Sequence, residues 1–122
     1  MVPINVVDRH IYTFDSEVVP AAKERGLCVV AMKVLGGVVG WQYGPGRGLL
    51  TSPEQYDMTM RYALGHPSVS ACVIGFSTVE ELDQGLEVAR NLTPVTPEEL
   101  AAFEPTAKEL AGQWGLHFGP PE

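Results

Sequence analysis

Three short apolar runs, each followed by a stretch with helical spacing, constrain the fold more than any other feature of the chain. The runs extend from Val2 to Val7, from Leu27 to Met32 and from Ala71 to Ile74. They are rich in β-branched residues and are apolar at consecutive positions, which is typical of parallel strands covered on both faces. Strands that alternate with helices form right-handed βαβ units, so the sequence predicts an α/β fold with about three βα units. Both a slice of a (β/α)8 barrel and a small doubly wound sheet satisfy this pattern.

Three of the expected helices begin with recognisable capping sequences. Ser52, Thr78 and Thr96 each stand three residues before a glutamine or glutamate, the arrangement of a capping box. The residues behind these caps form three apolar faces: Tyr56, Met60, Ala63 and Leu64; Val79, Leu82, Leu86 and Ala89; and Leu100, Phe103, Ala107, Leu110 and Trp114. We also expect a first helix at about residues 16–25, and we place the added C-terminal helix at about residues 97–114. Residues 1–115 are expected to form one unit, and residues 116–122 a polar tail.

The charge of the chain argues against some classes of partner. With 15 acidic and 8 basic side chains, the formal net charge is −7, so we expect repulsion from nucleic acids and from anionic membrane surfaces. No apolar run approaches the ~18 residues of a transmembrane helix. Cys28 and Cys72 lie within apolar runs, where small buried thiols in a reduced compartment are expected. These features together favour a cytoplasmic protein.

In α/β folds the functional face lies at the carboxyl ends of the strands, which directs attention to three segments. The segment from Gly75 to Thr78 turns from a strand into a helix, whose first backbone N–H groups and dipole suit an anion such as phosphate. An ordinary βα turn has the same appearance. The chain contains no G-x-G-x-x-G and no G-x-x-x-x-G-K-[ST] motif, so neither dinucleotide-fold nor P-loop binding is supported.

The other two segments carry charged and aromatic groups. Lys33 ends a strand and either pairs with a phosphate or carboxylate or keeps its ammonium group in water. The loop from Gly36 to Gly48 is rich in glycine and is either a functional loop, with Arg47 for an anion and Trp41 or Tyr43 for stacking, or a plain surface loop. Asp8 and His10 would share a face of an extended strand as an acid–base pair. The scattered histidines and cysteines show no metal-ligand spacing.

The order of these motifs resembles the C-terminal part of the aldo/keto reductases, NAD(P)H-dependent oxidoreductases built on a (β/α)8 barrel. The resemblance rests on N-x-x-D-R-H-x-Y-x-F at residues 5–14, on the Met32–Lys33 strand end, on R-Y-A-L at residues 61–64, on V-I-G-x-S-x-x-E-E-L at residues 73–82, and on the segment from Pro94 to Leu100. It covers nearly the whole chain. It implies a partial (β/α)8 TIM barrel with a C-terminal helix, and hydride transfer between the cofactor and a carbonyl or alcohol.

The resemblance also implies positions for the nicotinamide dinucleotide. Met32 falls opposite the nicotinamide, with Lys33 as a second-rank contact, and Leu35 and Gly36 fall in the belt over the pyrophosphate. Gly75, Phe76, Ser77 and Gln84 fall at the adenosine end. The glutamine that usually holds the carboxamide is replaced by Met1 or Val6, depending on the register. The Lys and Arg that commonly hold a 2′-phosphate are replaced by Phe76 and Glu81, so NAD is slightly favoured over NADP.

The family's catalytic Asp, Tyr, Lys and His belong to earlier strands, which are expected to be absent here, because such a barrel needs eight strands and ~250 residues. His10 and Lys33 do not replace them, so no catalytic residue is predicted in this chain. Two hypotheses follow. The chain is either the cofactor-binding, truncated C-terminal part of an aldo/keto reductase, or a non-catalytic α/β module that binds a nucleotide or a partner. Because a three-stranded slice has unpaired edges, we expect self-association or a complementary half-barrel.

Overall fold

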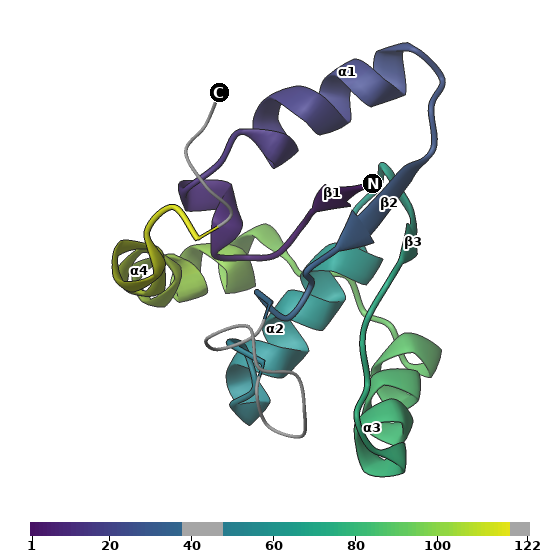
Figure 1. The fold of residues 1–122 in the computed structure, drawn as a ribbon, viewed down its shortest axis with the longest axis vertical. Coiled ribbons are helices and arrows are strands. Elements are labelled where there is room, and N and C mark those ends of the chain that lie inside the picture. Colours follow the sequence, from purple (N-terminus) through teal and green to yellow (C-terminus); the bar gives the residue numbers. More distant parts are fainter. Residues whose placement is uncertain (38–47, 118–122) are drawn as a thin grey trace.

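The computed structural model describes residues 1–37 and 48–117, and these form an α/β fold with a small parallel sheet and four α-helices (Figure 1). The strands are β1 (Val2–Pro3), β2 (Val29–Met32) and β3 (Val69–Cys72). The helices are α1 (Val19–Glu24), α2 (Pro53–Leu64), α3 (Val79–Arg90) and α4 (Pro97–Trp114). The predicted order of elements, including the C-terminal helix, is therefore confirmed.

The sheet is open and has the order β1-β2-β3, with both pairs of strands parallel. Val2 pairs with Ala31, and Ala31 pairs with Cys72, so the three strands are in register near the carboxyl end of β2. The third strand begins and ends two residues earlier than the run from Ala71 to Ile74 predicted. Backbone hydrogen bonding continues past β3, because the N–H of Val73 donates to the carbonyl of Ala31 at 2.8 Å.

The first apolar run contains only two strand residues, because a buried asparagine bends the chain after it. The side-chain Oδ1 of Asn5 accepts hydrogen bonds from the N–H groups of Val7 at 3.0 Å and of Asp8 at 2.8 Å. This local bonding competes with a strand ladder. A 3-10 turn over Asp8–His10 follows at once. The prediction of a strand up to Val7 is wrong for this reason.

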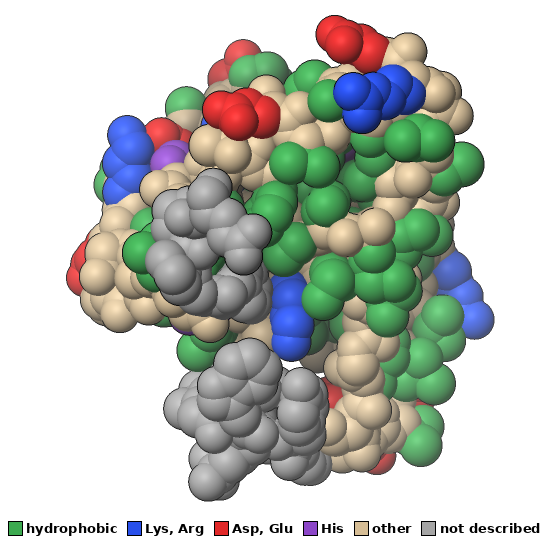
Figure 2. All heavy atoms as spheres, turned by 45° about the horizontal axis from the view of Figure 1, so that its top comes forward, with side chains coloured by type: hydrophobic (Ala, Val, Ile, Leu, Met, Phe, Trp, Pro, Cys, Tyr) green, Lys and Arg blue, Asp and Glu red, His purple; other side chains and the backbone are tan. Residues whose placement is uncertain are grey.

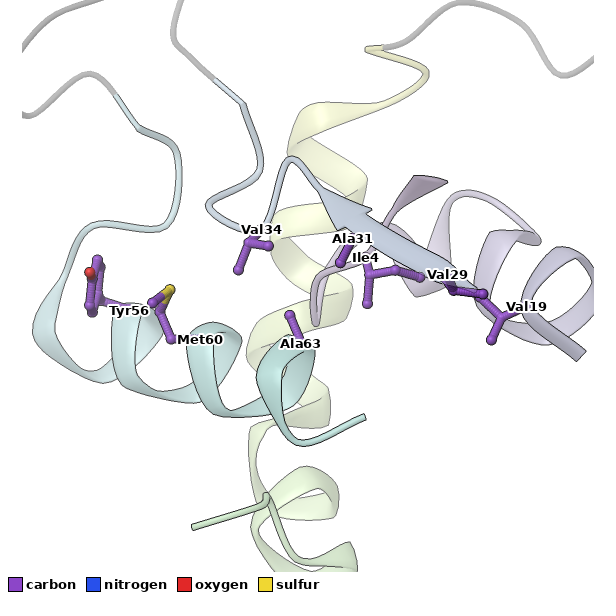
Figure 3. Packing of buried hydrophobic residues seen from close by; sticks show 8 residues of the cluster. All are labelled: Ile4, Val19, Val29, Ala31, Val34, Tyr56, Met60 and Ala63. Carbon is purple, nitrogen blue, oxygen red and sulfur yellow. The ribbon is translucent and has the colours of Figure 1, made fainter. Parts of the chain in front are cut away.

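Two buried clusters hold the helices to the sheet. The first lies between the sheet and helices α1 and α2, and Figure 3 shows its side chains converging from these elements: Ile4, Val19, Val29, Ala31, Val34, Tyr56, Met60 and Ala63. The second joins the segment after β1 to α4, through Val6, Val7, Leu50, Phe103, Ala107 and Ala111. The apolar faces predicted for α2 and α4 are the faces that these clusters use.

The three predicted helix caps are present. The side-chain oxygens of Ser52, Thr78 and Thr96 each accept a hydrogen bond from the backbone N–H three residues later, and Thr96 and Glu99 form the complete capping box. The first helix is shorter than predicted. A π-helical turn over Phe14–Val18 precedes it, and Pro20 lies in its first turn, where a missing N–H costs no hydrogen bond.

Several side chains that were expected to be buried are exposed. On α3, Val79 is 67% exposed and Leu82 is 41% exposed, and Val73 beyond β3 is 54% exposed. Figure 2 shows a broad area of hydrophobic side chains toward the side of the molecule where β3 and α3 lie. The sheet is therefore covered by helices on one face and not on both. Among the described residues, nothing packs against the exposed apolar side chains near β3 and on α3.

The cysteine prediction is also wrong in part, because Cys28 is exposed and Cys72 only partly buried. Neither forms a disulfide. Within residues 1–37 and 48–117, no helix has both the length and the apolar composition needed to span a bilayer.

Candidate functional site

A cavity of about 600 Å³ lies at the carboxyl ends of β2 and β3. Seven of the eight residues that the sequence assigned to a cofactor contribute to its wall: Met32, Lys33, Leu35, Gly75, Phe76, Ser77 and Gln84. The remaining wall comes from Met1, Val34, Gly37, Gly48, Thr51, Tyr56, Val73, Ile74 and Glu81. Residues from segments more than 40 positions apart thus line one space, whose volume is in the range of small-molecule sites.

The strand ends that form this wall are held in place by side-chain hydrogen bonds to backbone. The hydroxyl of Thr59 on α2 donates to the carbonyl of Val34 at 2.8 Å, and the side-chain amide of Asn5 donates to the carbonyl of Lys33 at 3.0 Å. Both side chains are buried. These two bonds fix the course of the chain as it leaves β2 and turns along the cavity.

Among the described residues that line the cavity, Lys33 is the only basic one. Its backbone has a φ of 53°, a left-handed conformation that costs a residue with a Cβ on the order of 1 kcal/mol or more. The bond from Asn5 to its carbonyl, and the bond at 2.8 Å from the N–H of Gly36 to the same carbonyl, stabilise this conformation. Lys33 therefore lies in a turn at the cavity wall whose conformation is held by these two hydrogen bonds.

Gly36 is the one predicted cofactor residue that does not line the cavity. It is buried with a φ of 76°, and a Cβ at this position would lie 2.4 Å from Cη2 of Trp114 on α4. Only glycine fits both the backbone conformation and this close approach. The structure therefore explains Gly36 by packing against α4, whereas the sequence suggested contact with a pyrophosphate.

The start of α3 is capped by a side chain of its own. A carboxylate oxygen of Glu81 accepts a hydrogen bond from the N–H of Ser77 at 2.6 Å, and the N–H of Glu81 donates to the hydroxyl of Thr78 at 3.2 Å. The negative charge thus lies at the positive end of the helix dipole. The anion site predicted for this turn is filled by the carboxylate of Glu81, which would repel a phosphate placed there.

Tyr56 is the cavity residue that the sequence did not single out, because its position predicted only an apolar helix face. The residue is 6% exposed, and its hydroxyl has no hydrogen-bond partner among the described residues. Figure 3 shows its ring standing on α2 beside Met60. Burial raises the pKa of the phenol, and the charge of Glu81 raises it further, so the hydroxyl is neutral at pH 7.

Asp8 and His10 do not form the acid–base pair that was considered for them. Asp8 accepts a hydrogen bond from the side chain of Asn5 at 2.6 Å and lies 2.7 Å from Nε2 of His117, while His10 faces Glu104 at 3.3 Å. The 3-10 turn separates the two side chains. Burial raises the pKa of Asp8 against the opposing effect of His117 and Asn5. Burial also lowers the pKa of His10, despite Glu104, so its imidazole is neutral at pH 7.

The remaining sequence predictions for this region are resolved only in part. Met1, one of the two positions considered for the carboxamide glutamine, lines the cavity, whereas the other, Val6, is fully buried in the second cluster. Trp41, Tyr43 and Arg47 lie outside the described residues. In the described part of the chain, no three His, Cys, Asp or Glu side chains are grouped so that they could hold a metal ion.

Comparisons of this chain with protein-family models, with curated proteins and with solved structures found no match.

Proposed function

We propose that this chain is the cofactor-binding C-terminal part of an aldo/keto reductase-like oxidoreductase, that its fold is a section of a (β/α)8 barrel, and that it acts in the cytoplasm. The cofactor is a nicotinamide dinucleotide, which supplies the hydride for reduction of a carbonyl. No residue of this chain is assigned to proton transfer. The proposal therefore concerns binding, and catalysis requires groups from elsewhere.

The observation that carries the proposal is the common cavity at the strand ends. Positions that the family resemblance assigns to the cofactor, such as Met32, Gly75 and Gln84, contribute to the wall of one cavity of about 600 Å³. The wall combines apolar side chains with few polar groups, as is usual for sites that bind cofactors. Lys33 brings a positively charged side chain to the cavity wall, which suits phosphates, and the largely apolar strand ends suit the planar rings.

The charge at the start of α3 supports NAD as the favoured cofactor. The carboxylate of Glu81 binds the N–H of Ser77 and lies at the cavity wall. A 2′-phosphate at this end would bring like charges together, whereas an unmodified ribose would offer hydroxyl donors to the carboxylate. We therefore expect NADH to bind more tightly than NADPH.

Titration of the purified chain with NADH and NADPH, followed by nicotinamide fluorescence, tests the proposal. Gly75→Leu is the decisive variant, because Gly75 lines the cavity and no atom lies within 4 Å of a Cβ there, so leucine adds bulk at the wall without a clash at its Cβ. We expect it to abolish detectable binding. Gly112→Leu on α4 is the matched control, since its Cβ position is equally open and lies outside the cavity. Absence of NADH binding by the unmodified chain at millimolar cofactor, or equal binding by both variants, contradicts the proposal.

A second candidate function is favoured by the exposed apolar side chains of β3 and α3. In this alternative the chain is a non-catalytic module that associates through its open sheet edge with a second copy or with a complementary half-barrel. Leu82 and Leu86 are 41% and 39% exposed on the apolar side of α3. Large exposed apolar areas are characteristic of interaction surfaces. This alternative predicts association without any nucleotide.

A further inference from the structure

The hydroxyl of Tyr56 is a buried polar group for which the described residues provide no partner. Tyr56 is 6% exposed, its hydroxyl is buried, and no described residue accepts or donates a hydrogen bond to it. More than nine in ten buried polar groups in folded proteins have a partner, because leaving one unpaired disfavours the folded state. A phenylalanine at this position would supply the same apolar packing without that cost. We therefore expect the hydroxyl to form a hydrogen bond with a group that is not part of the described fold.

The surroundings of this hydroxyl place it at the α3 end of the cavity. A Cβ at Gly85 would lie 3.3 Å from the hydroxyl and 2.6 Å from Cζ of Phe76, so the hydroxyl and the Phe76 ring both approach the same point on α3. Gly85 is the only buried residue of α3. Because Phe76 lines the cavity, its ring is the side chain that a bound molecule would displace to reach the hydroxyl. The Phe76 ring and the Tyr56 hydroxyl therefore occupy the space that a side chain at Gly85 would need.

Among the described residues that line this end, the other polar side chains are Ser77, Glu81 and Gln84, and none of the three is cationic. A phenol beside a carboxylate and a carboxamide can accept hydrogen bonds from hydroxyl or amino groups and can donate to a neutral acceptor. A phosphate would meet the charge of Glu81 instead. Phe76 and Ile74 add an apolar wall suited to a planar ring.

We propose that Tyr56 is a ligand-binding and specificity-determining residue, whose hydroxyl selects an uncharged group that carries hydroxyl or amino donors, such as the ribose or base of a nucleoside. This inference rests on the proposed function for the choice of a nucleoside. Its physical basis is the unpaired hydroxyl at the cavity, which does not depend on the family resemblance.

Tyr56→Phe tests the inference, with adenosine and NADH as probes in calorimetric titrations of the whole chain. We expect the variant to bind adenosine and NADH about five- to tenfold more weakly, which corresponds to loss of one hydrogen bond between neutral groups. Its resistance to urea should be unchanged or higher, because the unpaired hydroxyl is removed. Tyr62→Phe is the matched control. It also removes a phenol hydroxyl from α2, but that hydroxyl is bonded to Asp15 outside the cavity, so this variant should lose stability and keep its affinity.

The outcomes separate this inference from the proposed function. If the unmodified chain binds NADH and Tyr56→Phe binds it equally well, the inference is overturned and the proposed function stands. If the unmodified chain binds adenosine in a manner that depends on Tyr56 but does not bind NADH, the inference stands and the proposed function is wrong. Binding of neither probe overturns both. As a second variant, Gly85→Ala should weaken adenosine binding, because its methyl group would press the Phe76 ring toward the cavity.

Discussion

Single polar side chains join distant segments of this chain, and the cluster around Asp15 is the clearest case. Tyr62 donates a hydrogen bond from its hydroxyl to one carboxylate oxygen of Asp15, and Nε2 of His66 lies 3.1 Å from the other. The N–H of Ser68 donates to Nδ1 of His66 at 3.1 Å, so Nε2 carries the proton that faces the carboxylate. The cluster fastens the turn before α1 to the end of α2. Sequence patterns did not reveal it, because its members are nearly 50 positions apart.

Asp15→Asn should lower stability in a manner that depends on pH. Burial raises the pKa of Asp15, but the hydrogen bonds from His66 and Tyr62 outweigh this effect and the pKa is lowered. A lowered folded-state pKa means that the carboxylate contributes stability above the unfolded pKa, near 4, and that this contribution is lost as the pH falls through the folded value. At pH 7 we expect the variant to lose about 1.5–3 kcal/mol, as for hydrogen bonds to charged groups. The difference from the unmodified chain should shrink below pH 4.

Urea unfolding at pH 7 and pH 3 measures this effect. Glu17→Gln is the control, because Glu17 is an exposed carboxylate of the same turn. It should change stability by less than about 0.5 kcal/mol at either pH, as is usual for exposed positions. A loss in Asp15→Asn that is equally large at both pH values would show that the carboxylate charge is not responsible.

Among the elements, α3 combines a well-formed start with sparse burial. Its cap is well formed at Thr78 and Glu81, yet only Gly85 of its residues is buried. Gly85 rests on Phe76 and Tyr56, so the helix contacts the body at the cavity and not along its predicted apolar face. Caps depend on neighbouring residues and can be predicted from sequence, whereas the packed face of a helix depends on where its neighbours lie.

Glu81→Gln should lower the free energy of unfolding by about 0.5–1 kcal/mol, since it removes a charge that interacts with the helix dipole and with the N–H of Ser77. Glutamine keeps the length of the side chain and an acceptor oxygen, so the change isolates the charge. Glu80→Gln alters an exposed acid in the same turn, for which no hydrogen bond to the start of the helix is seen among the described residues, and it should have a smaller effect. Thermal unfolding followed by circular dichroism compares the two. A larger loss in Glu80→Gln would refute the assigned cap.

At the scale of the whole molecule, the main feature is an apolar face without a cover. Helices α1 and α2 and the first cluster occupy one side of the sheet, while hydrophobic side chains gather toward β3 and α3 on the exposed side (Figure 2). Strands β1 and β3 each have a free edge, because the described sheet is an open row of three. Parallel sheets are usually buried on both faces, so this arrangement favours association.

We expect sedimentation equilibrium to show mass that increases with protein concentration. The double variant Leu82→Glu, Leu86→Lys should shift the association constant downward by at least tenfold, because it places charges on the exposed side of α3. The two new side chains are four residues apart and can pair along the helix, which preserves its stability. Leu27→Glu changes an exposed leucine between α1 and β2 and should leave association unchanged. A monomer at every concentration would exclude the proposed surface.

The order of elements, the three helix caps and the apolar faces of α2 and α4 could be predicted from the sequence, because these depend on local spacing and on residues close in the chain. The sequence also predicted seven residues that the structure brings to one cavity. Their role in cofactor binding remains a proposal.

Features that depend on contacts between distant residues could not be predicted in this way and follow from the packed fold. The first strand ends early because Asn5 bonds to the backbone around it, Gly36 is glycine because Trp114 lies against it, and the anion site is filled because Glu81 reaches Ser77. The exposure of Cys28 and of the apolar side of α3 likewise follows from what does not pack there. The environment of the Tyr56 hydroxyl is also set by contacts between distant residues. The sequence position of Tyr56 is that of a core residue, and only the packing of the described residues shows that none of them bonds to the hydroxyl.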